Sequence, residues 1–283
     1  MSSYVKAYLR GDVFNAHISR AQEGLKKHMV GFVGSDFLPI GSGTLVKTCG
    51  YEGILTAHHV TAEIFRRNEI GLCIIDKSHF FYGPVSGLED VPVGASPCNS
   101  PPEKGPDLSF LVIRDSILMA KLKELKEFYP LSTQPRLHPV LGNRRFWSIT
   151  GTIGEMSIKA ETEDGPRARI RQFIGGGIYQ HTFKEDGEFD YVHLTVPSGT
   201  VPFPSNYEGM SGGGFWLLPM EIADSKDVST IQHRPPVLAG VEFAQLEYVG
   251  GQRVLVGHGP HSIYSCLKSS IDRCLRLGFL AHS

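Results

Sequence analysis

The sequence predicts a mostly β protein built from short strands, and two observations favour this class. The 283 residues include 32 glycines and 18 prolines, a content that indicates many turns and short elements rather than long helices. Apolar residues make up 41% and charged residues 20% of the chain, which is the balance of a globular protein with a core. A chain of this length can bury that core as one large unit or as two packed halves.

Short runs rich in β-branched and aromatic residues, bounded by Gly, Pro or Asp, are expected to form the strands. Arg167, Arg169 and Arg171 alternate in one of these runs, so we expect them to share one solvated face. The Pro-, Gly- and Ser-rich stretch 83–106 is expected to be a long surface loop. The predicted strands are residues 29–34, 43–46, 53–56, 70–75 and 108–113 in the first half, and 146–153, 167–174, 191–196, 236–243 and 253–256 in the second.

Helices are expected between the two halves and at the end of the chain. Leucines recur at three- and four-residue steps in 116–128, and Pro130 stops this pattern. Apolar residues recur every four positions in 262–277, before Gly278, which predicts an amphipathic helix with a glycine stop. A weaker helical pattern covers 19–28.

The net charge limits the classes of binding partner, and the cysteine content limits the cellular compartment. A formal net charge of −1 gives no reason to expect nucleic acid or an anionic membrane as a partner. No apolar run is typical of a signal peptide or a membrane span. An odd number of cysteines without a repeated spacing argues against a disulfide framework and a four-cysteine zinc site. We therefore expect a cytoplasmic protein, with a secreted protein that lacks its leader as the alternative. The five cysteines are Cys49, Cys73, Cys98, Cys266 and Cys274.

Three separated residues carry the most chemistry, in the order His59, Asp107, Ser211. A serine hydroxyl is a weak nucleophile until an imidazole takes its proton and a carboxylate fixes the tautomer of that imidazole. Ser211 lies in the run Gly-Met-Ser-Gly-Gly at 209–213. Glycines beside a serine let the backbone approach a scissile carbonyl and direct amide protons at the developing oxyanion. The pattern predicts a serine protease.

Three blocks resemble those of chymotrypsin-fold serine proteases, the family of trypsin and the bacterial Deg/HtrA proteases. The first is GSGTLV at 41–46 with ILTAHHV at 54–60, the second is DLSFL at 107–111, and the third is GMSGG at 209–213. The resemblance spans roughly residues 30–277 and implies an all-β fold of two antiparallel six-stranded β-barrels with an active site between them. The implied divisions are a leading segment (1–28), a first barrel (29–115), an inter-barrel helix and linker (116–138), a second barrel (139–260) and a C-terminal helix (261–283).

The resemblance assigns a role to each residue of the predicted triad. His59 fills the histidine place of the Thr-Ala-x-His block and would be the general base, while Asp107 would bind its remote nitrogen. Ser211 would be the nucleophile, and the amides of Gly209 and Ser211 would form the oxyanion hole. The implied activity is endopeptidase cleavage of a protein or peptide through an acyl-enzyme, with no metal or organic cofactor. His58 is expected to face the surface or to make a local hydrogen bond, and the competing carboxylates are Asp76, Asp90 and Asp115.

Departures from trypsin suggest how the site is controlled. Met210 stands where trypsin-like zymogens carry an Asp that pairs with a newly cut amino terminus, and Met cannot receive that charge. The site must then be preformed, or set by loop ordering or a partner, as in the Deg/HtrA group. Val60 and Tyr207 occupy places where trypsin has cysteines, which suits a disulfide-free enzyme. We expect a latent protease with an activating protein partner.

Substrate specificity is less evident from the sequence. The place at the base of trypsin's specificity pocket falls at Ser205, which is uncharged, so cleavage after Lys or Arg is not predicted. Residues 241–244 are expected to line the pocket, and Glu208 is a second candidate contact. Glu208 and Glu242 could favour a basic substrate, although an exposed position is the ordinary expectation for each. The pocket candidates in the second barrel are Ser205, Glu208, Val241, Glu242, Phe243 and Ala244.

Two alternatives remain open. A protease fold that has lost catalysis could grip a peptide as a binding module. The run 209–213 also satisfies Gly-x-Ser-x-Gly, the nucleophile elbow of α/β-hydrolase esterases, with His233, His258 and His261 downstream. The glycines after Ser211 start no helix, which disfavours the esterase. None of the twelve histidines falls in a His-Glu-x-x-His or other metal-ligand spacing.

Overall fold

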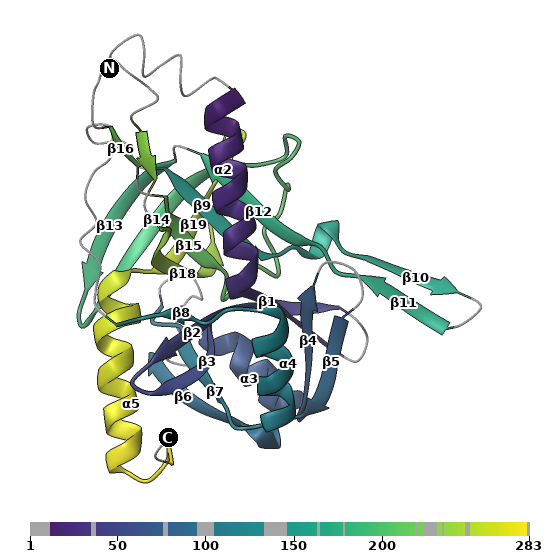
Figure 1. Ribbon diagram of the computed structural model, residues 1–283, viewed down its shortest axis with the longest axis vertical. Helices are drawn as coiled ribbons and strands as arrows, with labels where there is room; N and C mark the ends of the chain where they lie inside the picture. The colour runs from purple at the N-terminus through teal and green to yellow at the C-terminus, as the bar shows by residue number, and fades with distance from the viewer. Residues whose placement is uncertain are drawn as a thin grey trace.

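The computed structural model contains two antiparallel β-sheets, with helices before, between and after them (Figure 1). It describes residues 12–34, 38–75, 79–94, 105–132, 146–162, 165–177, 179–218, 220–222, 231–233, 235–246 and 250–281.

The first sheet comes from the first half of the chain and has the strand order β5-β4-β1-β2-β3-β7-β6, with the short β8 pairing in parallel with β2. Its centre is apolar on both faces, since every residue of β1 and β7 is buried. Strands β2 and β3 are joined through Cys49 and Gly50, whose φ angles of 50° and 83° suit a tight hairpin turn. The strands are β1 (Met29–Val33), β2 (Pro39–Thr48), β3 (Tyr51–Thr56), β4 (Glu69–Ile75), β5 (His79–Pro84), β6 (Leu88–Gly94), β7 (Leu108–Ile113) and β8 (Tyr129–Pro130).

The second sheet comes from the second half and has the order β12-β9-β15-β18-β19-β14-β13. Two separate hairpins, β10–β11 and β16–β17, accompany it, and β10–β11 projects away from the body of the molecule (Figure 1). The sheet strands are β9 (Trp147–Thr152), β12 (Gln172–Gly177), β13 (Gln180–Asp186), β14 (Phe189–Pro197), β15 (Gly214–Leu217), β18 (Val237–Gln245) and β19 (Gln252–His258). The hairpin strands are β10 (Ile158–Thr162), β11 (Gly165–Arg169), β16 (Met220–Ile222) and β17 (Ile231–His233).

The helices fasten the two sheets together. Helix α2 (Asp12–Leu25) is followed by the turn η1 (Lys26–His28), where the His28 ring stacks on Trp216 of β15 with ring centres 5.6 Å apart. Helix α5 (Leu267–Arg276) follows a π-helical turn, η6 (His261–Cys266), and buries Leu267 and Ile271. The other helical segments are α3 (His58–Arg67), η2 (Val85–Gly87), α4 (Ser116–Leu125) and η4 (Gly154–Met156).

The predicted fold class is confirmed. The protein is mostly β, with two antiparallel sheets and a C-terminal helix, which is consistent with a two-barrel all-β fold. The strand counts exceed the expected six, because the described part of the chain forms an eight-stranded and a seven-stranded sheet. One core cluster is shared by both sheets, with Val46 and Phe110 of the first packed together with Trp216 and Leu238 of the second.

Two local predictions are wrong. The expected loop 83–106 instead contains the end of β5, η2 and β6 as far as residue 94, while residues 95–104 lie outside the described part of the chain. Strand β6 buries Val91 and Val93 and tolerates Pro92 because it is the outermost strand of its sheet. The expected strand 167–174 is broken at Ile170, which is buried against Val33 and Cys73, so Arg171 lies outside both β11 and β12.

A tight contact between the sheets supplies the first prediction. A methyl group added at Gly31 of β1 would collide with the Thr152 side chain of β9, which is fully buried. Gly31→Ala should therefore lower the free energy of unfolding by about 1–3 kcal/mol, as measured by urea denaturation. Gly24→Ala in α2 is the control, because no atom lies within 4 Å of its added carbon; it should be neutral or slightly stabilising. Equal effects for the two changes would contradict this account of the contact.

Candidate active site

His59 lies in the first turn of α3, directly after the last buried residues of β3. The Asp107 carboxylate accepts two hydrogen bonds from this residue: His59 Nδ1 lies 2.6 Å from Oδ2, and the His59 backbone N–H donates to Oδ1 at 2.9 Å. Helix α3 has no side-chain cap from its own N-cap residue, Ala57, so Asp107 satisfies one of its free amides. One carboxylate therefore fixes both the helix terminus and the imidazole ring.

Asp107 is positioned by the entrance to β7 and by the second sheet. Its backbone N–H donates to His258 Nε2 at 2.9 Å, across from β19. Its side chain is only 8% exposed, whereas that of His59 is 50% exposed. Burial alone raises the pKa of Asp107, but the hydrogen bonds and charge of His59 outweigh it, and the net pKa is lowered. The carboxylate is therefore held in its charged form, facing a ring that solvent and substrate can reach.

Ser211 lies in the turn 209–213, directly before β15. Gly209 and Gly212 have φ angles of 90° and 93°, which favour glycine, and a side chain on Gly212 would collide with Ser42 and Thr56. Met210 is fully buried in the core of the second sheet. Apolar packing of Met210 therefore anchors the turn to the second sheet.

The turn is fastened to both sheets by hydrogen bonds. Ser42 of β2 donates its N–H to Ser211 O at 2.7 Å and its hydroxyl to Gly209 O at 2.7 Å. Thr152 of β9 donates its hydroxyl to the same Gly209 oxygen at 3.1 Å. Among the described residues, no protein group accepts a hydrogen bond from the amides of Gly209 and Ser211. These two amides are therefore free to serve an external oxygen.

The Ser211 hydroxyl makes its hydrogen bond to the backbone of β18 in this structure. It donates to Phe243 O at 3.5 Å, and no hydrogen bond joins it to His59 within the described part of the chain. The structure thus brings His59 and Asp107 into direct contact and places Ser211 where the two sheets meet, but the serine and histidine are not engaged.

The other expected site residues lie as follows. His58 Nδ1 is hydrogen-bonded to Ser109 Oγ of β7 at 2.9 Å, a contact with a distant part of the chain rather than a local one. Of the competing carboxylates, Asp115 caps α4, Asp90 is near Thr61, and Asp76 lies outside the described residues. Neither described carboxylate hydrogen-bonds to His59.

The expected pocket residues fall into an exposed group and a buried group. Ser205 is exposed, and its hydroxyl donates to Glu155 at 2.5 Å; Glu208 is exposed as well. The side chains of Val241 and Phe243 are buried. Glu242 is only 2% exposed, so the expectation of an exposed position is wrong for this residue. The remaining candidate, Ala244, is also buried.

Sequence reasoning did not foresee that two titratable groups, His258 and Glu242, are buried next to Asp107. His258 lies among the rings of Phe189, Tyr191 and Phe243, and burial lowers its pKa to about 4. Glu242 has a pKa raised well above its ordinary value, by burial first and by the charge of Asp107 second. Their sequence contexts, a strand-ending Gly-His-Gly and an apolar Gly-Val-Glu-Phe run, carry no signal for either role.

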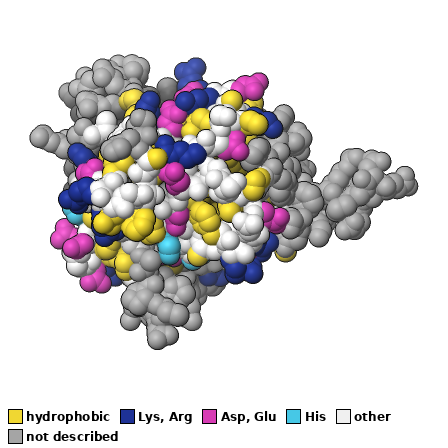
Figure 2. Space-filling model, turned by 90° about the horizontal axis from the view of Figure 1, so that it is seen from below, with side chains coloured by type: hydrophobic (Ala, Val, Ile, Leu, Met, Phe, Trp, Pro, Cys, Tyr) yellow, Lys and Arg dark blue, Asp and Glu magenta, His cyan; other side chains and the backbone are white. Residues whose placement is uncertain are grey.

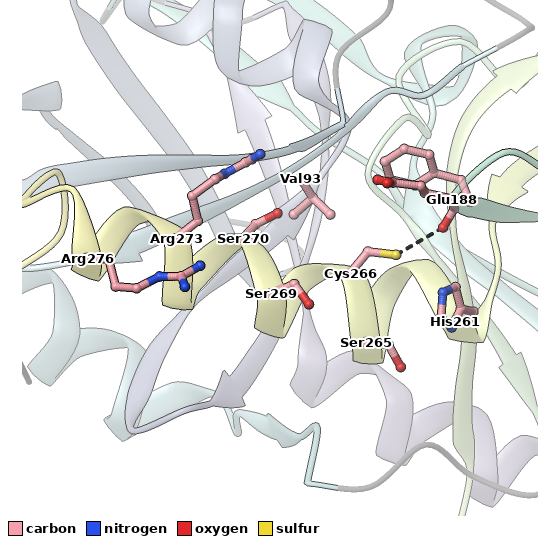
Figure 3. Close-up of a pocket in the computed structure, with 10 residues that line it drawn as sticks. Val93, Glu188, His261, Ser265, Cys266, Ser269, Ser270, Arg273 and Arg276 are labelled. Atoms are coloured by element: carbon pink, nitrogen blue, oxygen red, sulfur yellow. Dashed lines mark hydrogen bonds between the residues drawn. The ribbon is translucent and has the colours of Figure 1, made fainter.

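A pocket lies along α5, and its lining includes His261, Cys266, Arg273 and Arg276 (Figure 3). The Cys266 thiol donates to Glu188 O at 3.2 Å, and burial raises its pKa, so it is not an activated nucleophile. The four described cysteines, Cys49, Cys73, Cys266 and Cys274, are free. No cluster of three potential metal ligands occurs in the described ranges.

The surface and the helices add little about partners. On the face drawn in Figure 2, acidic and basic side chains are interspersed. Within the described residues, no helix combines the length and the apolar character needed to cross a membrane.

Comparisons with known proteins leave the family open. No protein-family model matches the sequence, and no curated protein matches it. A similar solved structure was reported for the Sesbania mosaic virus VPg protein, an intrinsically disordered protein whose coupled folding and binding is driven by aromatic interactions. The similarity covers 84% of this chain and 88% of that chain, at 17% identity and a TM-score of 0.44. The residues of the site, and not a relative, carry the functional argument.

The buried histidine yields a prediction on stability. Because His258 keeps a pKa of about 4 in the fold, against about 6.5 for an ordinary histidine, the unfolded chain takes up this proton first as the pH falls. Its contribution to stability is present above pH 6.5 and should be lost between pH 6.5 and 4, by about 3 kcal/mol. His258→Gln, which does not titrate, should show a smaller loss over this window in urea denaturation. Comparison at pH 8 isolates the effect of lost packing, and parallel curves for the two proteins would contradict the prediction.

Proposed function

We propose that this protein is a serine endopeptidase that acts through His59, Asp107 and Ser211. The observation that carries the proposal is the pair of hydrogen bonds from His59 to a buried Asp107 carboxylate. The glycine-flanked Ser211 lies where the two sheets meet, and among the described residues its amide and that of Gly209 have no acceptor. An exposed imidazole whose Nδ1 is held by a carboxylate has its Nε2 available as a base. A structural role for Asp107 alone, as the cap of α3, would not require the second bond to the ring.

The proposed reaction has two halves. His59 Nε2 takes the Ser211 proton as Oγ attacks the scissile carbonyl carbon, and the amides of Gly209 and Ser211 stabilise the resulting oxyanion. His59 then protonates the leaving amine, which departs and leaves an acyl-enzyme on Ser211. In the second half His59 deprotonates a water molecule, which attacks the ester and releases the acid and Ser211. Asp107 stays charged throughout and stabilises the imidazolium.

The hydroxyl orientation supports a latent enzyme. Ser211 donates to Phe243 O and not to His59, so the hydroxyl must leave this contact before His59 can take its proton. The buried Met210 supports a route other than zymogen cleavage, and an activating protein partner or the substrate itself would supply the change. We extend the proposal to a cytoplasmic enzyme resembling the Deg/HtrA proteases, with a protein or peptide substrate, and without nucleic acid or membrane as partners.

Substrate selection is proposed to involve the exposed Ser205 and Glu208, which lie in the segment leading to the nucleophile turn. The other pocket candidates, in β18, would contribute through their backbone, because the side chains of residues 241–244 are buried. This arrangement supports no preference for cleavage after Lys or Arg.

A catalytically inactive peptide-binding module is the second candidate function. The specific observation in its favour is the missing hydrogen bond between Ser211 and His59. The esterase alternative is weaker, because its base would be one of His233, His258 and His261; His258 already accepts a hydrogen bond from the Asp107 amide and is fully buried.

A fluorophosphonate probe separates the protease from the binding module. The probe should label the wild-type chain on Ser211, and Ser211→Ala should abolish labelling and reduce peptide cleavage by about 10⁶-fold, the scale known for another serine protease. Ser269→Ala, at an exposed serine of α5, is the matched control and should leave labelling intact. Cleavage by Ser211→Ala within tenfold of wild type would refute the proposal.

Substitution of the base and of its orienting group tests the other two residues. His59→Ala should abolish labelling, and Asp107→Asn should slow it by about 10⁴-fold because the imidazole loses its charged partner and its correct tautomer. Labelling that survives His59→Ala but is lost on changing a downstream histidine would favour the esterase.

A further inference from the structure

His258 is a fully buried histidine that is bonded to the main chain of Asp107. It is the last residue of β19, and its Nε2 atom accepts a hydrogen bond from the Asp107 backbone N–H at 2.9 Å. A backbone N–H can only donate, so Nε2 must be the unprotonated nitrogen, and the neutral ring must carry its proton on Nδ1. Burial keeps the ring in this neutral form, because it lowers the pKa of His258 to about 4 against the opposing charges of Asp107 and Asp190.

The protonated side of the His258 ring has no partner. Its Nδ1 atom is buried and finds no hydrogen-bond acceptor in the described part of the chain. A buried N–H group without an acceptor is costly, and an apolar ring would fill the same space without that cost. The histidine differs from such a ring in the acceptor that it offers to Asp107.

Aromatic packing restricts the orientation of the His258 ring. The segment that leads to Asp107 lies against the same aromatic side chains, because a methyl group added at Gly105 would press against two of them. The imidazole and this segment are therefore packed as one unit, with the Nε2 acceptor directed at the Asp107 amide. The surrounding rings, with centres 4.9 to 5.7 Å from that of His258, belong to Phe189, Tyr191 and Phe243.

Asp107 is held through both its main chain and its side chain. Its backbone N–H is bonded to His258, and its two carboxylate oxygens accept hydrogen bonds from the backbone and the ring of His59. The carboxylate is attached to the Cα atom through a single methylene group, so the position of the main chain largely decides where the carboxylate lies. A shift of the Asp107 amide would therefore displace the oxygen that faces His59 Nδ1.

We propose that His258 is a positioning residue that fixes the main chain of Asp107 and, through it, the carboxylate that orients His59. The inference deepens the proposed function and rests on it. His59 and Asp107 both come from the first half of the chain, and His258 gives the second sheet a part in aligning them. The neighbouring strand β18 contacts the Ser211 hydroxyl through Phe243 O, so the strand pair β18–β19 bears on the acid and on the nucleophile.

The experiment compares His258→Phe and His258→Gln with wild type in the rate of Ser211 labelling by a fluorophosphonate probe. Phe keeps a ring among the aromatic neighbours but offers no acceptor, whereas the side-chain oxygen of Gln can take the place of Nε2. His258→Phe should label about tenfold more slowly, the factor that a hydrogen bond of about 1.4 kcal/mol represents in a rate constant. His258→Gln should stay within about threefold of wild type, because the acceptor is restored. His193→Phe, at a half-buried histidine of β14, is the matched control and should label at the wild-type rate.

A second measurement does not depend on catalysis. A proton in a short charge-assisted hydrogen bond resonates far downfield in a proton NMR spectrum, and His59 Nδ1 lies 2.6 Å from Asp107 Oδ2. This resonance, assigned by its loss in His59→Ala, should shift in His258→Phe and keep its position in His258→Gln. If His258 only filled space, its replacement would lower the melting temperature without moving the resonance. His258→Leu also lacks an acceptor and serves the same test if His258→Phe does not fold.

The outcomes separate this inference from the proposed function. A folded His258→Phe or His258→Leu that leaves the His59 resonance unmoved would overturn the positioning role, as would a His258→Phe that labels at the wild-type rate. If the wild-type chain is not labelled on Ser211, the protease proposal fails, and the resonance alone then decides the role of His258.

Discussion

The buried carboxylate of Asp107 is the interaction on which the rest of the site depends. It joins three elements at once: the first turn of α3 through the His59 amide, the imidazole through Nδ1, and β19 through the bond from its own amide to His258. A buried charge is tolerated only where such partners compensate for lost water. Because the partners come from both sheets, the same bonds that keep the carboxylate charged also fix the relative positions of the base and the second sheet.

The part of the site around Ser211 is held by backbone hydrogen bonds and not by a buried charge. The turn that carries Ser211 uses backbone atoms, with Ser42 and Thr152 bonded to the Gly209 carbonyl and the Glu242 backbone bonded to Gly212 and Gly213. These contacts leave the amides of Gly209 and Ser211 without an acceptor in the described part of the chain, and they do not fix the orientation of the serine hydroxyl. The backbone of the turn is fixed, whereas the side chain of Ser211 can still rotate. Such a site could be assembled before a ligand binds, and the serine could contact the histidine afterwards.

Much of this arrangement could be predicted from the sequence, and the failures have physical causes. Short sequence motifs, such as the histidine after β3 and the glycines around Ser211, were enough to predict the candidate site residues and the class of fold. Edge strands were harder to predict: β13 is almost wholly exposed and has no apolar alternation, and β6 is interrupted by Pro92. The burial of Glu242 and His258 depends on residues distant in sequence, so no local pattern could reveal it. The domain limits and the catalytic roles stay predictions.

The stacking of His28 on Trp216 links the turn that follows the leading helix to the strand that follows the Ser211 turn. Trp216 belongs to β15, which begins one residue after Gly213, and it also packs edge-on against Tyr129 from the segment between the sheets. Residues before and after the first sheet therefore contact one short strand of the second. A change in the position of the leading helix would thus bear directly on the strand to which the Ser211 turn is joined.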